Sequence, residues 1–212
     1  CIKSALAQYL FAPFIRCNAD SQSFRFLATG VPTLETGRLR VTDIGGGKKR
    51  LEMDITIRPD AKWSDGRPIT TEDVAFYFEV GKAKGMPVLN PDFWERVNVR
   101  IKDARNFTLI FEPAYYYDTY GPINTYAPKH IMGPEWERVK AAARGLDPQK
   151  DAEKLNELYR NFFIKFSTPQ ALNRGAMVYS GPFMLRRWVP GNSIEMVRNP
   201  NSPACDAPLT ST

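Results

Sequence analysis

The sequence predicts a mixed α/β globular fold, and three observations lead to this prediction. The chain of 212 residues has 43% hydrophobic and 25% charged residues, a balance typical of a globular protein with a sizeable core. Two pairs of segments with alternating apolar and polar residues, each pair joined by a short turn, predict β-hairpins. Segments with apolar residues at helical spacing lie beside these hairpins. The length fits one large domain or two small ones.

The amino-terminal part predicts a short helix followed by a connection. Apolar residues recur at near-helical spacing over residues 4–12, and Pro13 cannot continue a helix. The next segment, residues 24–34, begins with alternation and breaks at Gly30 and Pro32. We expect it to connect the helix to the first long strand.

Residues 38–44 and 50–58 alternate on either side of three glycines, residues 45–47. This combination predicts a β-hairpin with a flexible turn. A glycine-rich phosphate loop would need a helix after the glycines, whereas here a second strand follows. We therefore interpret the glycines as a turn.

A turn and a capped helix follow the first hairpin. Asp65 and Gly66 supply turn chemistry. Thr70, with Asp73 three residues later, matches a capping box, and acidic residues in a first turn suit the helix dipole. We predict a helix from Thr71 to about residue 82, which Gly85, Pro87 and Pro91 then end.

Residues 97–103 and 106–112 predict a second hairpin. After it comes a connection, residues 113–128, which is rich in tyrosine, glycine and proline and is a poor place to bury five tyrosine hydroxyls. Tyrosines offer apolar faces and hydrogen bonds without demanding one particular partner. Four candidate ligand contacts lie here, with packing inside the domain as the alternative: Tyr116, Tyr120, Asn124 and Tyr126.

The carboxy-terminal part returns from helices to strands. Helical spacing predicts helices over 134–144 and 147–166. Alternation predicts strands over 181–189 and 194–198, joined by a turn. The segment 199–212 carries three prolines and no apolar run, so we expect a loose tail.

Composition and motif searches argue against several function classes. The net charge is +6, but the 29 lysines and arginines are spread along the chain, which indicates solubility rather than nucleic-acid binding. No run reaches the ~18 to 20 apolar residues that a membrane-spanning helix needs, so we expect no membrane insertion by this segment.

Metal, disulfide and catalytic sites are also not predicted. The three cysteines, Cys1, Cys17 and Cys205, form no CxxC pair. His130 is the single histidine, and no motif places a nucleophile beside it, so a structural or surface role is favoured. We expect no metal, no cofactor and no enzyme activity.

Several short motifs, in fixed order from about Ser4 to Asn201, resemble the extracellular solute-binding proteins, family 5, that serve oligopeptide, dipeptide and nickel ABC importers. The first is the turn and helix start in AKWSDGRPITTEDV, with an arginine-terminated strand before it. The matching segments are Ile57–Arg58, Trp63–Gly66, Thr70–Val74, Pro128–Ile131, Gly181–Phe183, Pro190–Gly191 and Arg198–Pro200.

This resemblance implies a periplasmic-binding-protein-like fold of type II with an extra satellite domain. Family members usually have more than twice this length, so we expect a truncated fragment with one lobe only. By the resemblance, residues 1–128 form the satellite domain and residues 129–200 form part of the first ligand-binding lobe. Residues 201–212 are then the loose tail.

The resemblance also implies a function. The chain is expected to capture peptides or similar small solutes outside the cytoplasm and to deliver them to ABC permease subunits of the inner membrane. A periplasmic or extracytoplasmic location is expected, and a lipid anchor in the full-length protein stays open. The alternative is a non-transport interaction or regulatory fragment that has lost ligand binding.

Two sets of residues are singled out by these motifs. By the resemblance, Ser180 and Gly181 lie where the chain returns near the hinge, so they are candidate ligand contacts, with backbone geometry as the alternative role. Turn geometry and helix capping explain the signature residues, which we interpret as structural. These are Trp63, Asp65, Gly66, Thr70 and Asp73.

Overall fold

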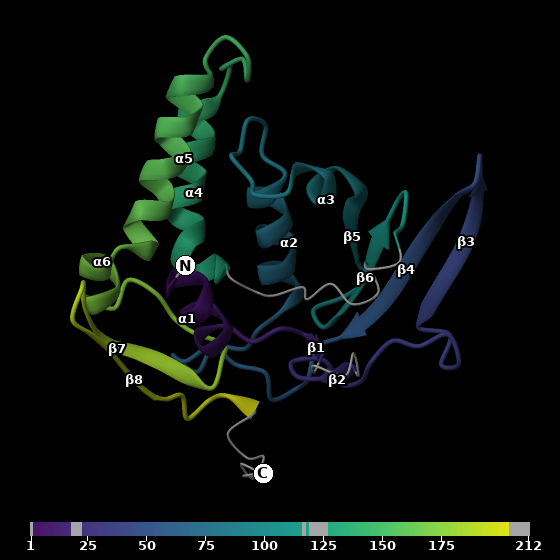
Figure 1. Ribbon diagram of the computed structural model, residues 1–212, viewed down its shortest axis with the longest axis horizontal. Helices are drawn as coiled ribbons and strands as arrows, with labels where there is room; N and C mark the ends of the chain where they lie inside the picture. The colour runs from purple at the N-terminus through teal and green to yellow at the C-terminus, as the bar shows by residue number, and fades with distance from the viewer. Residues whose placement is uncertain (1, 18–22, 116–117, 119–126, 204–212) are drawn as a thin grey trace.

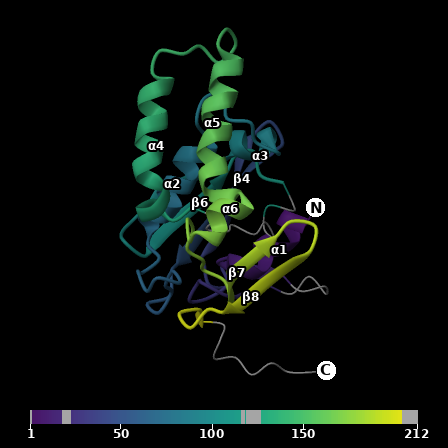
Figure 2. The same ribbon diagram turned by 90° about the vertical axis from the view of Figure 1, so that its left-hand side faces the viewer.

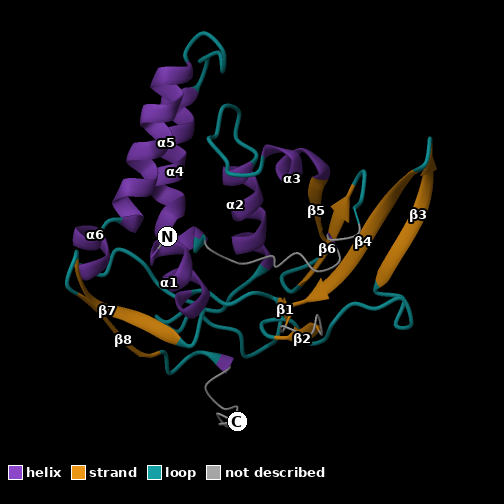
Figure 3. Ribbon diagram, in the orientation of Figure 1, coloured by secondary structure: helices purple, strands orange, loops and turns teal. Residues whose placement is uncertain are grey.

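The computed structural model of the protein describes residues 2–17, 23–115, 118 and 127–203. A four-stranded sheet lies at one end of the molecule and a pair of long helices at the other, with a third helix between them (Figure 1). Figure 3 shows the same division into strands and helices. None of the helices in the described ranges is both long and apolar enough to cross a membrane.

The amino-terminal helix is confirmed as α1 (Ile2–Leu10). It is followed by a small antiparallel sheet that the sequence did not predict, made of β1 (Ile15–Cys17) and β2 (Ser23–Arg25). Each strand has three residues, which is too short for alternation to be recognised in the sequence.

Both predicted hairpins are present, and together they form one antiparallel sheet in the order β3-β4-β6-β5. Alternate residues of β4 are buried on one face of this sheet, as a strand with one covered side requires. The strands are β3 (Leu39–Gly45), β4 (Lys48–Thr56), β5 (Val97–Ile101) and β6 (Asn106–Phe111).

The other face of the sheet carries charged side chains that pair across the strands. Asp54 is at the centre: its carboxylate lies 2.7 Å from Arg40 Nη1 and 2.8 Å from Lys102 Nζ. Thr108 Oγ1 donates a further hydrogen bond of 2.6 Å to Asp54. The hydrogen bond from Arg40 is the main reason why the pKa of Asp54 lies far below the ordinary range.

Helix α2 (Thr71–Gly81) begins at the predicted residue, and the predicted capping box of Thr70 and Asp73 is present. The helix lies between the sheet and the long helices (Figure 1). Phe78 packs into a core cluster with the sheet, whereas Phe76 packs into a second cluster with the long helices. Helix α2 therefore belongs to both hydrophobic cores.

The loop predicted after α2 contains a short helix, α3 (Pro91–Arg96). Pro91 stands at its first position, and the side chain of Asn90 accepts a hydrogen bond of 3.2 Å from the backbone N–H of Phe93. Both are helix-start signals, and sequence reasoning missed them because the prolines were interpreted only as helix breakers.

The two long helices are α4 (Lys129–Ala143) and α5 (Ala152–Ser167), followed by a short unpredicted helix, α6 (Pro169–Asn173). The predicted start at Pro134 was wrong, because α4 begins at Lys129 and Pro134 lies inside it. A partner for the first backbone N–H of α4 comes from a distant residue, as described below, and sequence alone gives no sign of it.

The last two strands form a separate antiparallel hairpin, β7 (Phe183–Val189) and β8 (Ser193–Arg198), as predicted. Figure 2 shows this hairpin beside α1 and below the long helices. The start of the predicted loose tail needs correction. Ser202 is buried, and the side chain of Asn201 donates a hydrogen bond of 3.0 Å to the carbonyl of Ser64. Residues 204–212 lie outside the described residues.

Candidate functional site

The turn at Trp63–Gly66 and the start of α2 form one hydrogen-bonded unit. Gly66 has φ of +88°, a conformation that favours glycine, and its N–H donates to the carbonyl of Trp63 at 2.9 Å. The carboxylate of Asp65 accepts from the backbone N–H of Arg67 at 3.1 Å. The indole of Trp63 is fully buried, and its Nε1 donates to Asp73 at 3.2 Å.

Asp73 lies at the centre of this unit. Besides the bond from Trp63, its carboxylate accepts from the backbone N–H of Thr70 at 3.0 Å and from that of Lys129 at 2.9 Å. Burial raises the pKa of Asp73 above its ordinary value, although these hydrogen bonds act in the opposite direction. A carboxylate that is buried and bonded in this way is a structural feature.

His130 is placed against the same turn. Its Nε2 lies 2.8 Å from the carboxylate of Asp65, and its ring meets that of Trp63 edge-on with 6.4 Å between the ring centroids. The imidazole side chain is 17% exposed. The partner of His130 is a turn residue, so the geometry agrees with the structural role favoured by the sequence.

A second contact joins this turn to the segment before β7. The backbone N–H of Ser64 donates to the carbonyl of Tyr179 at 2.8 Å, and the N–H of Tyr179 donates to Ser64 Oγ at 3.0 Å. Residues 115 positions apart in the chain are therefore held in a reciprocal pair. Sequence reasoning gave Ser64 no role, since a serine in a turn carries no signal of such a long-range partner.

Ser180 and Gly181, the described candidates for ligand contact, face the interior. Ser180 is fully buried, and its Oγ accepts a hydrogen bond of 2.9 Å from the backbone N–H of Ala12. The N–H of Gly181 donates to the carbonyl of Leu10 at 2.8 Å. A Cβ atom at Gly181 would stand 2.5 Å from the carbonyl oxygen of Tyr9. Both residues hold α1 against the β7–β8 hairpin, and ligand contact stays a prediction.

Asn199 directly follows β8 and bonds to the residues that directly precede β7. It is fully buried, and its Nδ2 donates to the carbonyl of Gly181 at 2.8 Å. Its backbone N–H donates to the carbonyl of Pro182, also at 2.8 Å. In the sequence, the Arg-Asn-Pro motif served only to identify the family. In the structure, its asparagine joins the residue after β8 to the residues before β7.

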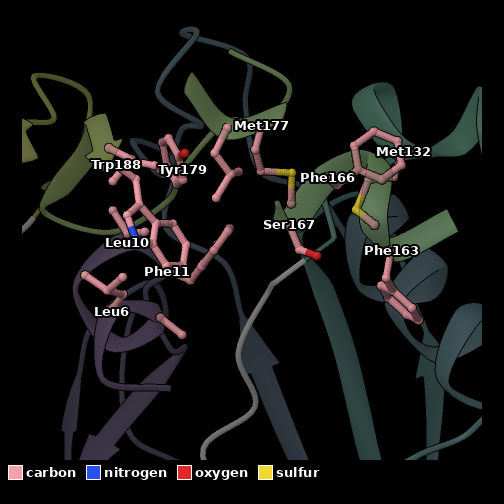
Figure 4. Close-up of a pocket in the computed structure, with 13 residues that line it drawn as sticks. Leu6, Leu10, Phe11, Met132, Phe163, Phe166, Ser167, Met177, Tyr179 and Trp188 are labelled. Atoms are coloured by element: carbon pink, nitrogen blue, oxygen red, sulfur yellow. The ribbon is translucent and has the colours of Figure 1, made fainter. Parts of the chain in front are cut away.

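An apolar pocket with a volume of about 230 Å³ lies beside Tyr179. Figure 4 shows residues of α1 gathered with Tyr179 and Trp188 on one side, and Met132 with Phe163 on the other. No charged side chain is among the described residues that line it, and burial raises the pKa of Tyr179 to about 12. The walls can therefore hold an apolar group without selecting it by charge. They include Leu6, Leu10, Phe11, Phe166, Met177 and Leu185.

The other candidate ligand contacts lie outside the described residues: Tyr116, Tyr120, Asn124 and Tyr126. The structure does describe the residue before them. The guanidinium of Arg96 lies over the ring of Tyr115, 4.1 Å from its centroid, and pairs with Asp118 at 2.7 Å. The backbone N–H of Tyr115 also donates to Asp118 at 2.6 Å. This pair of buried charges fixes the start of the tyrosine-rich segment.

Comparison with protein families identifies a family whose model matches most of the chain. The family model of bacterial extracellular solute-binding proteins, family 5 Middle, matches residues 48–203. Curated relatives include a peptidoglycan-binding protein, YepA, of Agrobacterium fabrum, which is 29% identical over 76% of this chain and 21% of its own length. A probable ABC transporter-binding protein of Deinococcus radiodurans is 28% identical over 72% of this chain and 23% of its own length.

Two solved structures illustrate the range of structural similarity. An oligopeptide binding protein from Thermus thermophilus, complexed with a pentapeptide, has a TM-score of 0.93 and 91% sequence identity. The match covers 96% of this chain and 34% of that protein. The oligopeptide-binding protein AppA of Bacillus subtilis, in complex with a nonapeptide, has a TM-score of 0.57 at 18% identity. That match covers 94% of this chain and 32% of the Bacillus protein, and it shows a shared fold.

Proposed function

Because this chain belongs to the bacterial extracellular solute-binding proteins of family 5, we propose that it is part of the substrate-binding component of an ABC importer that captures peptides. The observation that carries the proposal is the 91% identity, over 96% of this chain, to the Thermus thermophilus protein complexed with a pentapeptide. The chain spans 34% of that protein, so the activity proposed is that of a larger whole.

Within this proposal, residues 1–128 correspond to the satellite domain and residues 129–200 to part of the first lobe. Asp73 and His130 both have structural partners, which supports a scaffold role for them. Capture would then rest on non-covalent contacts, with no cofactor and no catalytic step. The captured peptide would pass to permease subunits at the membrane, from outside the cytoplasm.

The apolar pocket beside Tyr179 supports peptide capture in a limited way. Its uncharged walls suit side chains of varied shape, as a protein that accepts many peptides requires. The tyrosine-rich segment after the Arg96–Asp118 pair remains the second proposed contact region. The apolar pocket offers no charge among its described lining residues to select a particular side chain, so the proposal names peptides as a class.

A chimera tests the proposal. The stretch of the Thermus thermophilus protein that corresponds to this chain is replaced by this chain, and pentapeptide binding is measured by calorimetry. We expect the Kd to stay within about threefold of that of the parent protein, because the exchanged stretches are 91% identical. A threefold change in Kd corresponds to about 0.7 kcal/mol of binding free energy. Circular dichroism serves as the folding control. A folded chimera that does not bind the pentapeptide would contradict the proposal and favour the interaction-fragment alternative.

A further inference from the structure

The carboxylate of Asp73 serves two helices at once. One oxygen, Oδ2, accepts from the backbone N–H of Thr70, which closes the capping box of α2. The other oxygen, Oδ1, accepts from the backbone N–H of Lys129, the first residue of α4, across 56 positions of sequence. Helix α4 begins after Pro128, and no side-chain hydrogen bond of its own caps that end. Asp73 therefore supplies a partner that the local sequence of α4 lacks.

We propose that Asp73 is a positioning residue, a shared cap of α2 and α4, which fixes the proposed satellite domain and the proposed lobe segment to each other as one rigid unit. The inference rests on the proposed function only for the assignment of these two parts. It goes beyond that function because it names the residue that sets their relative position.

Several further contacts near Asp73 also join residues 1–128 to the part of the chain that follows residue 128. Ser64 pairs with Tyr179 in both directions, at 2.8 and 3.0 Å. Asp65 meets His130 at 2.8 Å, and the side chain of Asn201 reaches the carbonyl of Ser64 at 3.0 Å. Any change in the relative position of the two parts would break several of these bonds together. Because these bonds would all be lost at once, we expect the two parts to move as one unit.

Hydrogen exchange, followed by NMR on the 212-residue chain, tests the proposal. Asp73→Ala should accelerate exchange by about tenfold or more in the first turns of both α2 and α4, because it removes both carboxylate oxygens and so one hydrogen bond at each helix. Thr70→Ala is the matched control, since the threonine side chain caps α2 alone. It should accelerate exchange in the first turn of α2 and leave α4 unchanged.

A second pair of variants isolates the bond to α4. Lys129→Pro removes the backbone N–H that donates a hydrogen bond to Asp73. The helix itself should tolerate this change, because proline suits the first position of a helix. Lys129→Ala keeps that N–H but removes the side chain, which pairs with Glu72. We expect faster exchange of the α4 first turn in Lys129→Pro than in Lys129→Ala.

The outcomes separate clearly. The proposal stands if Asp73→Ala affects both helix starts and the two Lys129 variants differ. It is overturned if Asp73→Ala leaves the start of α4 unchanged, or if the two Lys129 variants behave alike. If Asp73→Ala does not fold, the Lys129 pair decides. None of these measurements uses a peptide, so their failure is distinct from a failure of the chimera to bind one.

Discussion

At the scale of single residues, Gly181 stands where the backbone of α1 leaves no space for a side chain. We expect Gly181→Ala to lower the free energy of unfolding by about 1–3 kcal/mol, because the added Cβ would overlap the carbonyl of Tyr9, at 2.5 Å, and push α1 away from the β7–β8 hairpin. Urea denaturation followed by circular dichroism measures the change.

Gly133→Ala provides the matched control for this prediction. A Cβ at Gly133, inside α4, would meet Lys129 Cγ at 3.6 Å, which is an ordinary contact. Alanine is the better helix former by about 1 kcal/mol, so this variant should be neutral or more stable. Equal destabilisation by Gly181→Ala and Gly133→Ala would contradict the prediction, because the contact between Gly181 and the carbonyl of Tyr9 would then not determine stability.

The pair of Arg96 and Asp118 makes a second residue-scale prediction. Their side chains are 5% and 2% exposed, so Asp118→Asn would leave a buried guanidinium without its main partner. We expect a loss of about 3–5 kcal/mol in unfolding free energy, measured by chemical denaturation.

Asp92→Asn is the comparison for that experiment. Asp92 also pairs with Arg96, at 2.9 Å, but it is 58% exposed and its charge is screened by solvent. We expect a loss below about 1 kcal/mol. If the two variants lower the free energy of unfolding by the same amount, burial of the Arg96–Asp118 pair is not the source of its stabilising effect.

At the scale of secondary-structure elements, the ion pairs on the β3-β4-β6-β5 sheet predict a loss of stability in acid. The pKa of Asp54 is lower in the folded protein than the ordinary value of about 3.9, chiefly because Arg40 donates a hydrogen bond to its carboxylate. The stabilisation is therefore complete above that value and is lost as the pH falls below it.

Thermal unfolding between about pH 6 and pH 2.5 measures this effect. We expect Asp54→Asn to be less stable than the parent protein at pH 6 and to lose less stability on acidification. Asp60→Asn is the comparison for a local ion pair, because the pKa of Asp60 is also lowered, chiefly by the hydrogen bond from Arg58 two residues away. An unchanged pH dependence in Asp54→Asn would contradict the assignment.

At the scale of the whole molecule, α2 joins two hydrophobic cores. Phe78 belongs to the core under the sheet, and Phe76 to the core with Trp136 and Phe162 of the long helices. We expect Phe78→Ala and Phe76→Ala each to cost about 3–5 kcal/mol. Since both cores share one helix, each variant should still unfold in a single transition, detected alike by near-UV and far-UV circular dichroism.

Two separate transitions in either variant would contradict this prediction. They would indicate that residues 1–128 and 129–200 unfold independently, as two autonomous domains do. The matched positions on α2, two residues apart and both buried, make the comparison direct, because helix propensity changes equally in the two variants.

Most of the regular elements could be predicted because their signals are local. The hairpin around residues 45–47, the capping box at Thr70 and the alternation of β7 and β8 each depend on residues close together in the chain. Sequence reasoning missed α3, α6 and the small β1–β2 sheet, where the elements are short. It also placed the start of α4 at Pro134, because the residue that caps this helix is far away in sequence.

The sequence by itself determined the family, the mixed α/β class and the order of most elements, because motif spacing and periodicity are written along the chain. Only the tertiary structure decided which distant segments the signature turn and helix start hold in place. Asp73 lies 56 positions from Lys129, and Ser64 lies 115 positions from Tyr179, so their partners depend on how separate segments pack. The same packing buries Ser180 and leaves no room for a side chain at Gly181, which periodicity cannot predict.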